Sequence, residues 1–240
     1  MAEAHKSCGS LHMIYDDDCL VDPDFKLFSA VDHNATDAKG LVRGSAKFFQ
    51  YQGYSVVLKR YFRGGAIRHL SQDNYFYTGF DRTRMVREFR LLTSMKHLGL
   101  PVPRPIAALV ERRPMLYSGC LLTEKISVDG TLADLTRRTI LSHKRWEEIG
   151  QCVAQFHHHG VFHSDLNAEN ILLNIQPKSK NCDISIIDFD KCYINPKLSA
   201  NKRKANLDRL KRSLEKIGAW ASESSTSRSE WQALLRGYQS

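Results

Sequence analysis

Short runs of aromatic and β-branched residues mark the first half of the chain. Residues 47–51 and 54–59 form two such runs, separated by a Gln-Gly pair. Two runs of this kind around a turn dipeptide predict a β-hairpin. Two more strand-like runs, 106–111 and 115–126, bracket a proline-containing turn. The segment upstream of residue 126 is therefore expected to be rich in strands.

Apolar residues recur at helical spacing in two other segments, 81–98 and 146–156. Steps of three and four residues place the apolar side chains on one face, which predicts two amphipathic helices. A glycine follows each segment, as is typical of a helix end. The two stripes consist of Met85, Phe89, Leu92 and Met95, and of Trp146, Ile149, Val153 and Phe156.

The order of these elements predicts an α+β fold. Strands, a helix, strands, a helix, a loop, a strand and a final helix follow one another along the 240 residues. This order indicates a β-rich N-terminal lobe over residues 1–125 and a short helical C-terminal lobe over residues 126–240. Apart from its ends, the chain is expected to be continuously folded, because no internal repeat or long low-complexity tract interrupts it.

The composition indicates the cellular compartment and the charge of the partners, but it does not identify a function. Thirty-five Lys and Arg against 26 Asp and Glu give a net charge of +9, which favours anionic partners. The six cysteines include no Cys-x-x-Cys pair, which fits a reduced, cytosolic protein. No stretch resembles a signal-peptide core or reaches the ~20 apolar residues of a spanning helix. Any membrane contact is expected to be peripheral.

The segment from His163 to Leu173 carries the densest chemistry. It reads HSDLNAENILL, and Asp188, in the run IDFD, follows 18 residues after Asn170. This pattern resembles the catalytic loop H-x-D-x-x-x-x-N and the metal-binding turn D-F-G of the protein-kinase-like superfamily. The sequence therefore places a carboxylate and an amide in one loop and a second carboxylate at a strand end.

Each of these three residues has a candidate role. Asp165 is the candidate catalytic residue, which orients the attacking hydroxyl and accepts its proton. Asn170 and Asp188 are the candidate metal ligands, because Mg2+ takes hard oxygen ligands and bridges nucleotide phosphates. The plain alternative is that Asp and Asn merely cap turns, but the three occur in the right order beside apolar runs.

Candidate nucleotide-binding residues lie upstream. Lys59 ends the strand-like run 54–59, and alternation places it on one face with Val57. Glu88 falls on the apolar stripe of the predicted helix, where a carboxylate needs a cationic partner. We expect an ion pair that holds Lys59 toward the α and β phosphates of a nucleotide. The alternative for Lys59 is a solvated strand lysine.

The glycine-containing segment before this strand is a weaker candidate. Gly44 and Ser45 stand at a suitable distance from Lys59, but the segment does not spell G-x-G-x-x-G. Their backbone N–H groups are suited to bind phosphates. A plain hairpin turn is an equal alternative.

Two further clusters have competing explanations. Histidines at 157–159 and 163 lie near a helix end, but adjacent histidines cannot all face one ion, so helix-dipole contacts are favoured over zinc. The segment 197–217 has eight basic and two acidic residues, so 8 − 2 gives +6. It presents either a basic face to anionic lipid headgroups or a solvated face above a buried stripe.

Longer stretches resemble one family. Residues 61–65, 75–84, 88–92, 102–105 and 163–167 look like the bacterial 3-deoxy-D-manno-octulosonic acid (Kdo) kinases. The resemblance implies a protein-kinase-like bilobal fold with Asp165 as the active-site residue. It also implies a cytoplasmic, inner-membrane-associated enzyme that uses ATP, with Mg2+, to phosphorylate the 4-hydroxyl of Kdo in Kdo-lipid A during lipopolysaccharide core assembly. The expected partners are Kdo-lipid A and the inner membrane surface, with no nucleic acid.

Departures from the protein kinases favour a small or lipid-linked acceptor. The third position of the metal turn is Asp190 rather than glycine, and only 240 − 188 = 52 residues follow Asp188. Five arginines are of a type that binds the carboxylate and phosphate groups of such an acceptor. They are Arg60, Arg63, Arg68, Arg82 and Arg84. A small atypical protein kinase, an aminoglycoside-type phosphotransferase and an inactive anion-binding or membrane-binding module are the alternatives.

Overall fold

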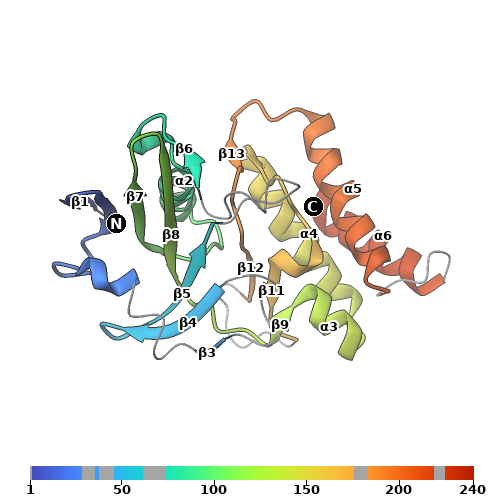
Figure 1. Cartoon of the computed structure of the whole chain (residues 1–240). Helices are drawn as coiled ribbons and strands as arrows, with labels where there is room; N and C mark the ends of the chain where they lie inside the picture. Colours follow the sequence, from blue (N-terminus) through green and yellow to red (C-terminus); the bar gives the residue numbers. More distant parts are fainter. Residues whose placement is uncertain (1, 29–35, 38–45, 62–73, 176–182, 219–224) are drawn as a thin grey trace. The chain divides into compact units, whose positions relative to one another are not determined.

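The chain forms two compact units. A computed structural model describes residues 2–28, 36–37, 46–61, 74–175, 183–218 and 225–240 (Figure 1). One unit comprises Met1–Ser94 and Pro103–Ile126, and the other comprises Met95–Val102 and Ser127–Ser240. Sequence reasoning placed a single boundary between residues 125 and 126, whereas this division also assigns residues 95–102 to the second unit.

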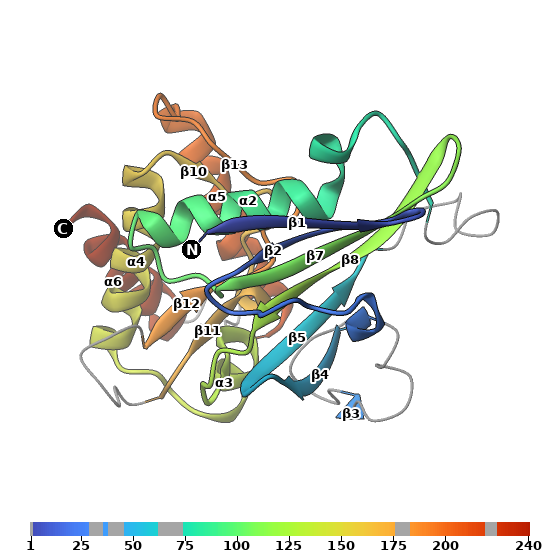
Figure 2. The ribbon, with the colours of Figure 1, turned by 90° about the vertical axis from the view of Figure 1, so that its left-hand side faces the viewer.

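An antiparallel sheet forms the first unit. Its strands run in the order β1-β2-β7-β8-β5-β4-β3, and β6 pairs with β8 (Figure 2). The strands are β1 (Glu3–Cys8), β2 (Leu11–Asp16), β3 (Thr36–Asp37), β4 (Ala46–Tyr51), β5 (Tyr54–Arg60), β6 (Tyr75–Phe76), β7 (Pro105–Arg112) and β8 (Leu116–Glu124). The strand runs at 47–59 and 106–126 are thus confirmed.

The β4–β5 hairpin has the predicted turn. Tyr51 pairs with Tyr54, and Gln52 and Gly53 both have positive φ, at 43° and 84°. Two successive residues with positive φ suit the right-handed twist of the strands on either side. The hairpin therefore carries β5 back along the sheet with Lys59 near its end.

Alternation along the sheet separates its two faces. Val56 and Leu58 belong to a buried cluster with residues of β2, β7 and β8 and with the 3-10 helix η1 (Phe25–Phe28). Helix α2 (Arg84–His97) runs along the sheet (Figure 2) and buries the predicted apolar stripe. A Cβ atom at Gly119 of β8 would lie 2.8 Å from Met85 Cε, so helix and sheet are in close contact there.

The second unit is mainly helical (Figure 1). The strands pair as β12-β11-β9 and as β10-β13. Its elements are β9 (Gly130–Thr131), α3 (Leu132–Arg138), α4 (His143–His158), β10 (Val161–Phe162), the 3-10 helix η4 (Ala168–Asn170), β11 (Ile171–Leu173), β12 (Ile184–Ile186), β13 (Tyr193–Ile194), α5 (Ala200–Lys216) and α6 (Ser225–Gln239). The helix expected around 146–156 is α4, and the one expected at 197–217 is α5.

The expectation that the ends lie outside the continuous fold was wrong at both ends. At the N-terminus, β1 is mostly exposed, so hydrophobic patterning marks it poorly, and pairing with β2 makes it a strand. At the C-terminus, α6 buries Ala233 and Leu234 completely. Helices α4 and α6 approach so closely that a Cβ atom at Gly150 would lie 2.0 Å from Leu234 O.

Two further findings concern the described cysteines and helices. No disulfide bond joins any two of the five described cysteines, and burial raises the pKa of Cys120 to about 12 and that of Cys19 to about 11. Among the described residues, every helix is too short or too polar to span a bilayer.

Candidate active site

The first unit holds the predicted ion pair. Lys59 Nζ on β5 lies 3.0 and 2.9 Å from the two carboxylate oxygens of Glu88 on α2. Glu88 is only 4% exposed, whereas 29% of the Lys59 side chain is exposed. The ion pair is confirmed, and it fixes a partly exposed ammonium group on the side of the sheet that α2 covers.

Tyr61 is a further member of this group that sequence reasoning missed. Its hydroxyl donates a hydrogen bond of 2.6 Å to Glu88 Oε2. Its ring lies 5.0 Å from Lys59 Nζ and 5.2 Å from the guanidinium carbon of Arg84, which are distances for cation–π contact. The buried carboxylate therefore accepts hydrogen bonds from an ammonium and a phenol, which compensates for its loss of water.

In the second unit, hydrogen bonds shape the loop that carries Asp165 and Asn170. Asn167 Oδ1 accepts from the backbone N–H groups of Glu169 and Asn170 and so caps η4. Asn170 Nδ2 donates to Asp165 O at 2.9 Å. Because the Asn170 amide nitrogen is engaged, its oxygen Oδ1 is the atom suited to ligate a metal.

His163 ties this loop to the turn that carries Asp188. Its Nε2–H donates to Ile187 O at 3.0 Å, and its Nδ1 accepts from the Asp165 backbone N–H at 3.1 Å. These two contacts fit a single neutral tautomer. Ile187 N–H donates in turn to Asn170 O at 3.0 Å. The loop and the turn are therefore joined directly through the backbone on either side of the candidate ligands.

The turn itself has an unusual backbone at Asp188, whose φ is 65°. A non-glycine residue in this left-handed region is uncommon and is often found at functional sites. Next to it, Phe189 is 1% exposed and stacks on Phe156 with ring centroids 5.8 Å apart. Burial of Phe189 holds the turn while the Asp188 side chain remains exposed.

The neighbouring Asp190 stands where the D-F-G pattern has glycine. Ser164 Oγ donates a hydrogen bond of 2.8 Å to Asp190 O, and Ser164 N–H donates to Cys192 Sγ at 3.2 Å. These contacts use the main chain of Asp190 and the side chain of Cys192. The replacement of glycine at position 190 is thus compatible with a closely held turn.

Helix α5 supports the catalytic loop from outside the motif. Asn206 Oδ1 accepts from His163 N–H at 3.2 Å, and Asn206 Nδ2 donates to His163 O at 2.8 Å. Seven residues further along α5, Ser213 Oγ accepts from Ala168 N–H at 3.1 Å. Both ends of the loop are therefore bound to one helix.

The same asparagine joins α5 to two other helices. His157 Nε2 on α4 lies 3.2 Å from Asn206 Oδ1, and His157 Nδ1 lies 2.8 Å from Tyr238 Oη on α6. In the neutral ring, Nε2–H donates to the amide and Nδ1 accepts from the phenol. Burial lowers the pKa of His157. Two of the four clustered histidines, 157 and 163, thus serve in hydrogen bonding.

Asp165 also has a charged partner on α5. Arg209 Nε donates to Asp165 Oδ1 at 2.7 Å, and Nη2 contacts the same oxygen. Both side chains are about half exposed, at 48% for Arg209 and 45% for Asp165. Sequence reasoning missed Arg209, because position 209 looked like one basic residue among eight in its segment.

The predicted site residues therefore divide into two described groups. Lys59 and Glu88 lie together in the first unit, and Asp165, Asn170 and the turn of Asp188 are linked in the second. Gly44 and Ser45 lie outside the described residues, so their phosphate-binding role stays a prediction. The amide oxygen of Asn170 and the carboxylate of Asp188 are hard donors of the kind that fits Mg2+.

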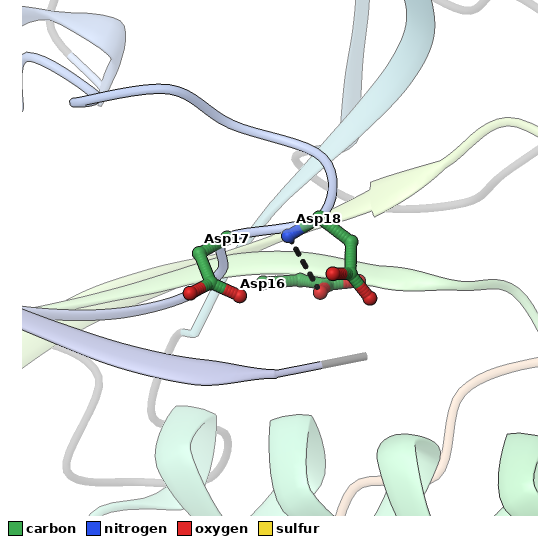
Figure 3. Close-up of side chains that lie close together, drawn as sticks. All are labelled: Asp16, Asp17 and Asp18. Atoms are coloured by element: carbon green, nitrogen blue, oxygen red, sulfur yellow. Dashed lines mark hydrogen bonds between the residues drawn. The ribbon is translucent and has the colours of Figure 1, made fainter.

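A second acidic group, at the end of β2, has a different character (Figure 3). Asp16, Asp17 and Asp18 offer carboxylate oxygens within 4.8 Å of one another. The buried Asp16, however, accepts hydrogen bonds from the backbone N–H groups of Ala2 and Asp18, at 3.2 and 3.3 Å, and pairs with Arg104 at 2.8 Å. Its contacts join the start of the chain at Ala2 to Arg104, which precedes β7.

The overall structure resembles protein kinases. The Rio2 kinase of Chaetomium thermophilum, solved as an ADP/Mg2+-phosphoaspartate complex, aligns with 88% of this chain and 66% of its own, with a TM-score of 0.51 and 14% identity. WaaP in complex with acyl carrier protein aligns over 90% and 81%, with a TM-score of 0.55 and 15% identity. The fold is therefore α+β and protein-kinase-like, as predicted.

Sequence comparison gives the family. The model of the lipopolysaccharide kinase (Kdo/WaaP) family matches residues 35–238. The 3-deoxy-D-manno-octulosonic acid kinase of Vibrio vulnificus (strain YJ016) is 35% identical over 235 residues, which cover 97% of this chain and 96% of the relative. The chain belongs to the lipopolysaccharide kinase (Kdo/WaaP) family, so the resemblance found in the sequence is confirmed.

The Lys59–Glu88 pair predicts a difference between single and double variants. Lys59→Met takes the ammonium from a buried carboxylate and is expected to lower the free energy of unfolding by on the order of 2 kcal/mol. Lys59→Met with Glu88→Gln removes both charges and keeps an acceptor for Tyr61, so it is expected to be more stable than the single variant. Denaturant unfolding measures both. A double variant no more stable than the single one would contradict this account.

The buried His157 predicts a dependence of stability on pH. Because the pKa of His157 is lower in the folded protein than the ordinary value of about 6.5, the unfolded chain binds the proton more readily. The stabilising effect of the neutral ring is complete above about pH 6.5 and is lost as pH falls below it. Melting temperatures of wild type and His157→Gln between pH 5 and 8 test this. The variant should show the flatter profile, and parallel profiles would count against it.

Proposed function

We propose that this protein transfers the γ-phosphoryl group of ATP to the 4-hydroxyl of Kdo in Kdo-lipid A during lipopolysaccharide core biosynthesis. The observation that carries the proposal is the alignment of nearly the whole chain with a relative named as a 3-deoxy-D-manno-octulosonic acid kinase. The family to which both proteins belong is that of the lipopolysaccharide kinases. The hydrogen-bonded loop around Asp165 also carries residues suited to phosphoryl transfer.

Asp165 is the proposed general base. Its Oδ1 contacts Arg209, whereas Oδ2 makes no hydrogen bond within the described part of the chain. In the proposed step, the acceptor hydroxyl gives its proton to Oδ2 as its oxygen bonds to phosphorus, and the bond from phosphorus to the leaving ADP oxygen breaks. The hydrogen bonds from Asn167 and Asn170 to Asp165 O hold the base in place.

Lys59, Asn170 and Asp188 are the proposed nucleotide and metal residues. Bound MgATP supplies the phosphoryl group and a metal charge that offsets its negative oxygens. Asn170 Oδ1 and the Asp188 carboxylate would hold the metal, since both are hard oxygen donors. Lys59 would bind the α and β phosphates, with Glu88 keeping the ammonium in one orientation.

The proposed location is the cytoplasmic face of the bacterial inner membrane, with peripheral attachment. Support comes from the lipid-linked acceptor and from the net charge of +9, since anionic headgroups attract basic proteins. A peripheral protein held by charge is expected to leave isolated inner membranes when they are washed with high salt. Retention after high-salt washing, measured by immunoblotting of the two fractions, would contradict this mode of attachment.

A transfer assay with purified components tests the activity. Wild-type protein with Mg2+ and labelled ATP is expected to phosphorylate Kdo-lipid A at the 4-hydroxyl, and Asp165→Ala is expected to lose most turnover while it still binds nucleotide. Asp208→Asn is the matched control, because Asp208 pairs with Lys204 on α5 and has no proposed catalytic role. Near-normal turnover by Asp165→Ala would remove Asp165 from its role. No transfer by wild type would refute the activity.

A further inference from the structure

Apart from Arg203 and Arg212, the basic residues of α5 lie in two stripes with different partners. Lys204 pairs with Asp208 at 2.7 Å, and Lys211 pairs with Glu215 at 3.8 Å. Each pair spans four residues, and the second pair follows the first by seven, which is nearly two turns of helix. One long flank of α5 is therefore neutralised by its own acidic residues.

Within the described residues, no ion pair joins the cations of the other stripe to an acidic residue of α5. Lys202, Arg209 and Lys216 also repeat every seven residues, so these three cations share a flank, whereas Arg212 lies at its edge, four residues after Asp208 and three before Glu215. Lys202 Nζ lies 5.0 Å from the ring of Phe162, next to the catalytic loop. Arg212 and Lys216 make no ion pair within the described residues. The flank of residues 202, 209 and 216 is called the basic flank below.

The basic flank reaches the candidate catalytic base at Arg209. Both guanidinium contacts end on Asp165 Oδ1 and use Nε and Nη2. Within the described residues, Nη1 donates no hydrogen bond. A guanidinium has five N–H donors in a planar fork, and 48% of this side chain is exposed. Arg209 can therefore contact Asp165 and present free donors to a second anion at once.

We propose that Arg209 binds the carboxylate of the Kdo acceptor, and that the basic flank of α5 is the acceptor-binding surface beside Asp165. This inference rests on the proposed function and identifies how the same site recognises its substrate. In Kdo the carboxyl carbon is C1 and the accepting hydroxyl is on C4, so two carbons separate them. A hydroxyl at Asp165 thus brings its carboxylate close to the arginine that contacts Asp165, and arginine forks bind carboxylates well.

Arrangement of charge favours this role over simple attachment to a membrane. Attachment by charge needs only exposed cations, and the cations of the opposite flank are already paired. The uncompensated cations instead continue from the residue that contacts Asp165. A positive flank at this position also stabilises an anionic acceptor next to a carboxylate that would otherwise repel it.

The experiment combines variants with chemically altered acceptors. Arg209→Gln removes the charge, and Lys211→Gln is the matched control because it removes the same charge from the opposite flank of the same helix. Each protein is assayed for kcat/KM on three acceptors in detergent: Kdo-lipid A, its Kdo methyl ester, and Kdo-lipid A lacking the lipid A phosphates. Circular dichroism and melting temperature establish that each variant is folded.

Substitution of Arg209 is expected to have little effect on kcat/KM when the acceptor carboxylate is present as its methyl ester. For wild type and Lys211→Gln, kcat/KM should be at least about tenfold lower for the ester than for the acid, as expected for loss of a charged hydrogen bond. Arg209→Gln should use acid and ester nearly equally, mainly through a raised KM for the acid. Arg209→Lys should restore part of the preference, since it keeps the charge without the fork.

Three results would overturn the inference. An equal loss by Arg209→Gln on acid and ester means that Arg209 only positions Asp165. A loss that disappears only with the dephosphorylated lipid means that Arg209 binds phosphate rather than carboxylate. Failure of wild type to phosphorylate any of the three acceptors refutes the proposed function itself, and the inference with it. The first two results leave the proposed function intact.

Discussion

The amide of Asn206 is the contact on which the candidate catalytic loop depends. It bonds both the N–H and the C=O of His163, at a position where the loop backbone is irregular and buried. Buried backbone groups without partners cost free energy comparable to a lost hydrogen bond. Since His163 in turn bonds Asp165 and Ile187, the candidate base and the turn of Asp188 are both linked through His163 to one side chain of α5.

The buried polar groups of the two units have different kinds of hydrogen-bond partner. In the first, the buried carboxylate of Glu88 accepts hydrogen bonds from an ammonium and a phenol, which fix its orientation. In the second, neutral amide and imidazole groups form a chain from Tyr238 through His157 to Asn206. Such satisfied networks are rigid, which suits residues whose geometry must not change when charged ligands arrive.

The sequence predicted those parts of the site whose chemistry and spacing are both local. Asp165, Asn170 and Asp188 stand in a short pattern, and Glu88 was found because a carboxylate on an apolar helical stripe needs a partner. Asn206 and Arg209 lack such a signal, because their partners are more than 40 residues away and depend on how α5 packs. The five arginines selected from the first unit were chosen by type alone. The spacing of charges along α5 was visible in the sequence. Only the structure shows which of its two charge stripes lies beside the loop of Asp165.

The position of α5 also places the support of the loop and the proposed recognition of the acceptor in one helix. Residues 206, 209 and 213 are spaced by three and four, so they lie along one side of the helix, and each contacts the loop at a different point. A helix fixed at two backbone positions cannot shift Arg209 without straining the loop. An anion bound by Arg209 is thereby placed at a fixed distance from Asp165. Specificity for an anionic acceptor and alignment of its hydroxyl would then arise from the same packing.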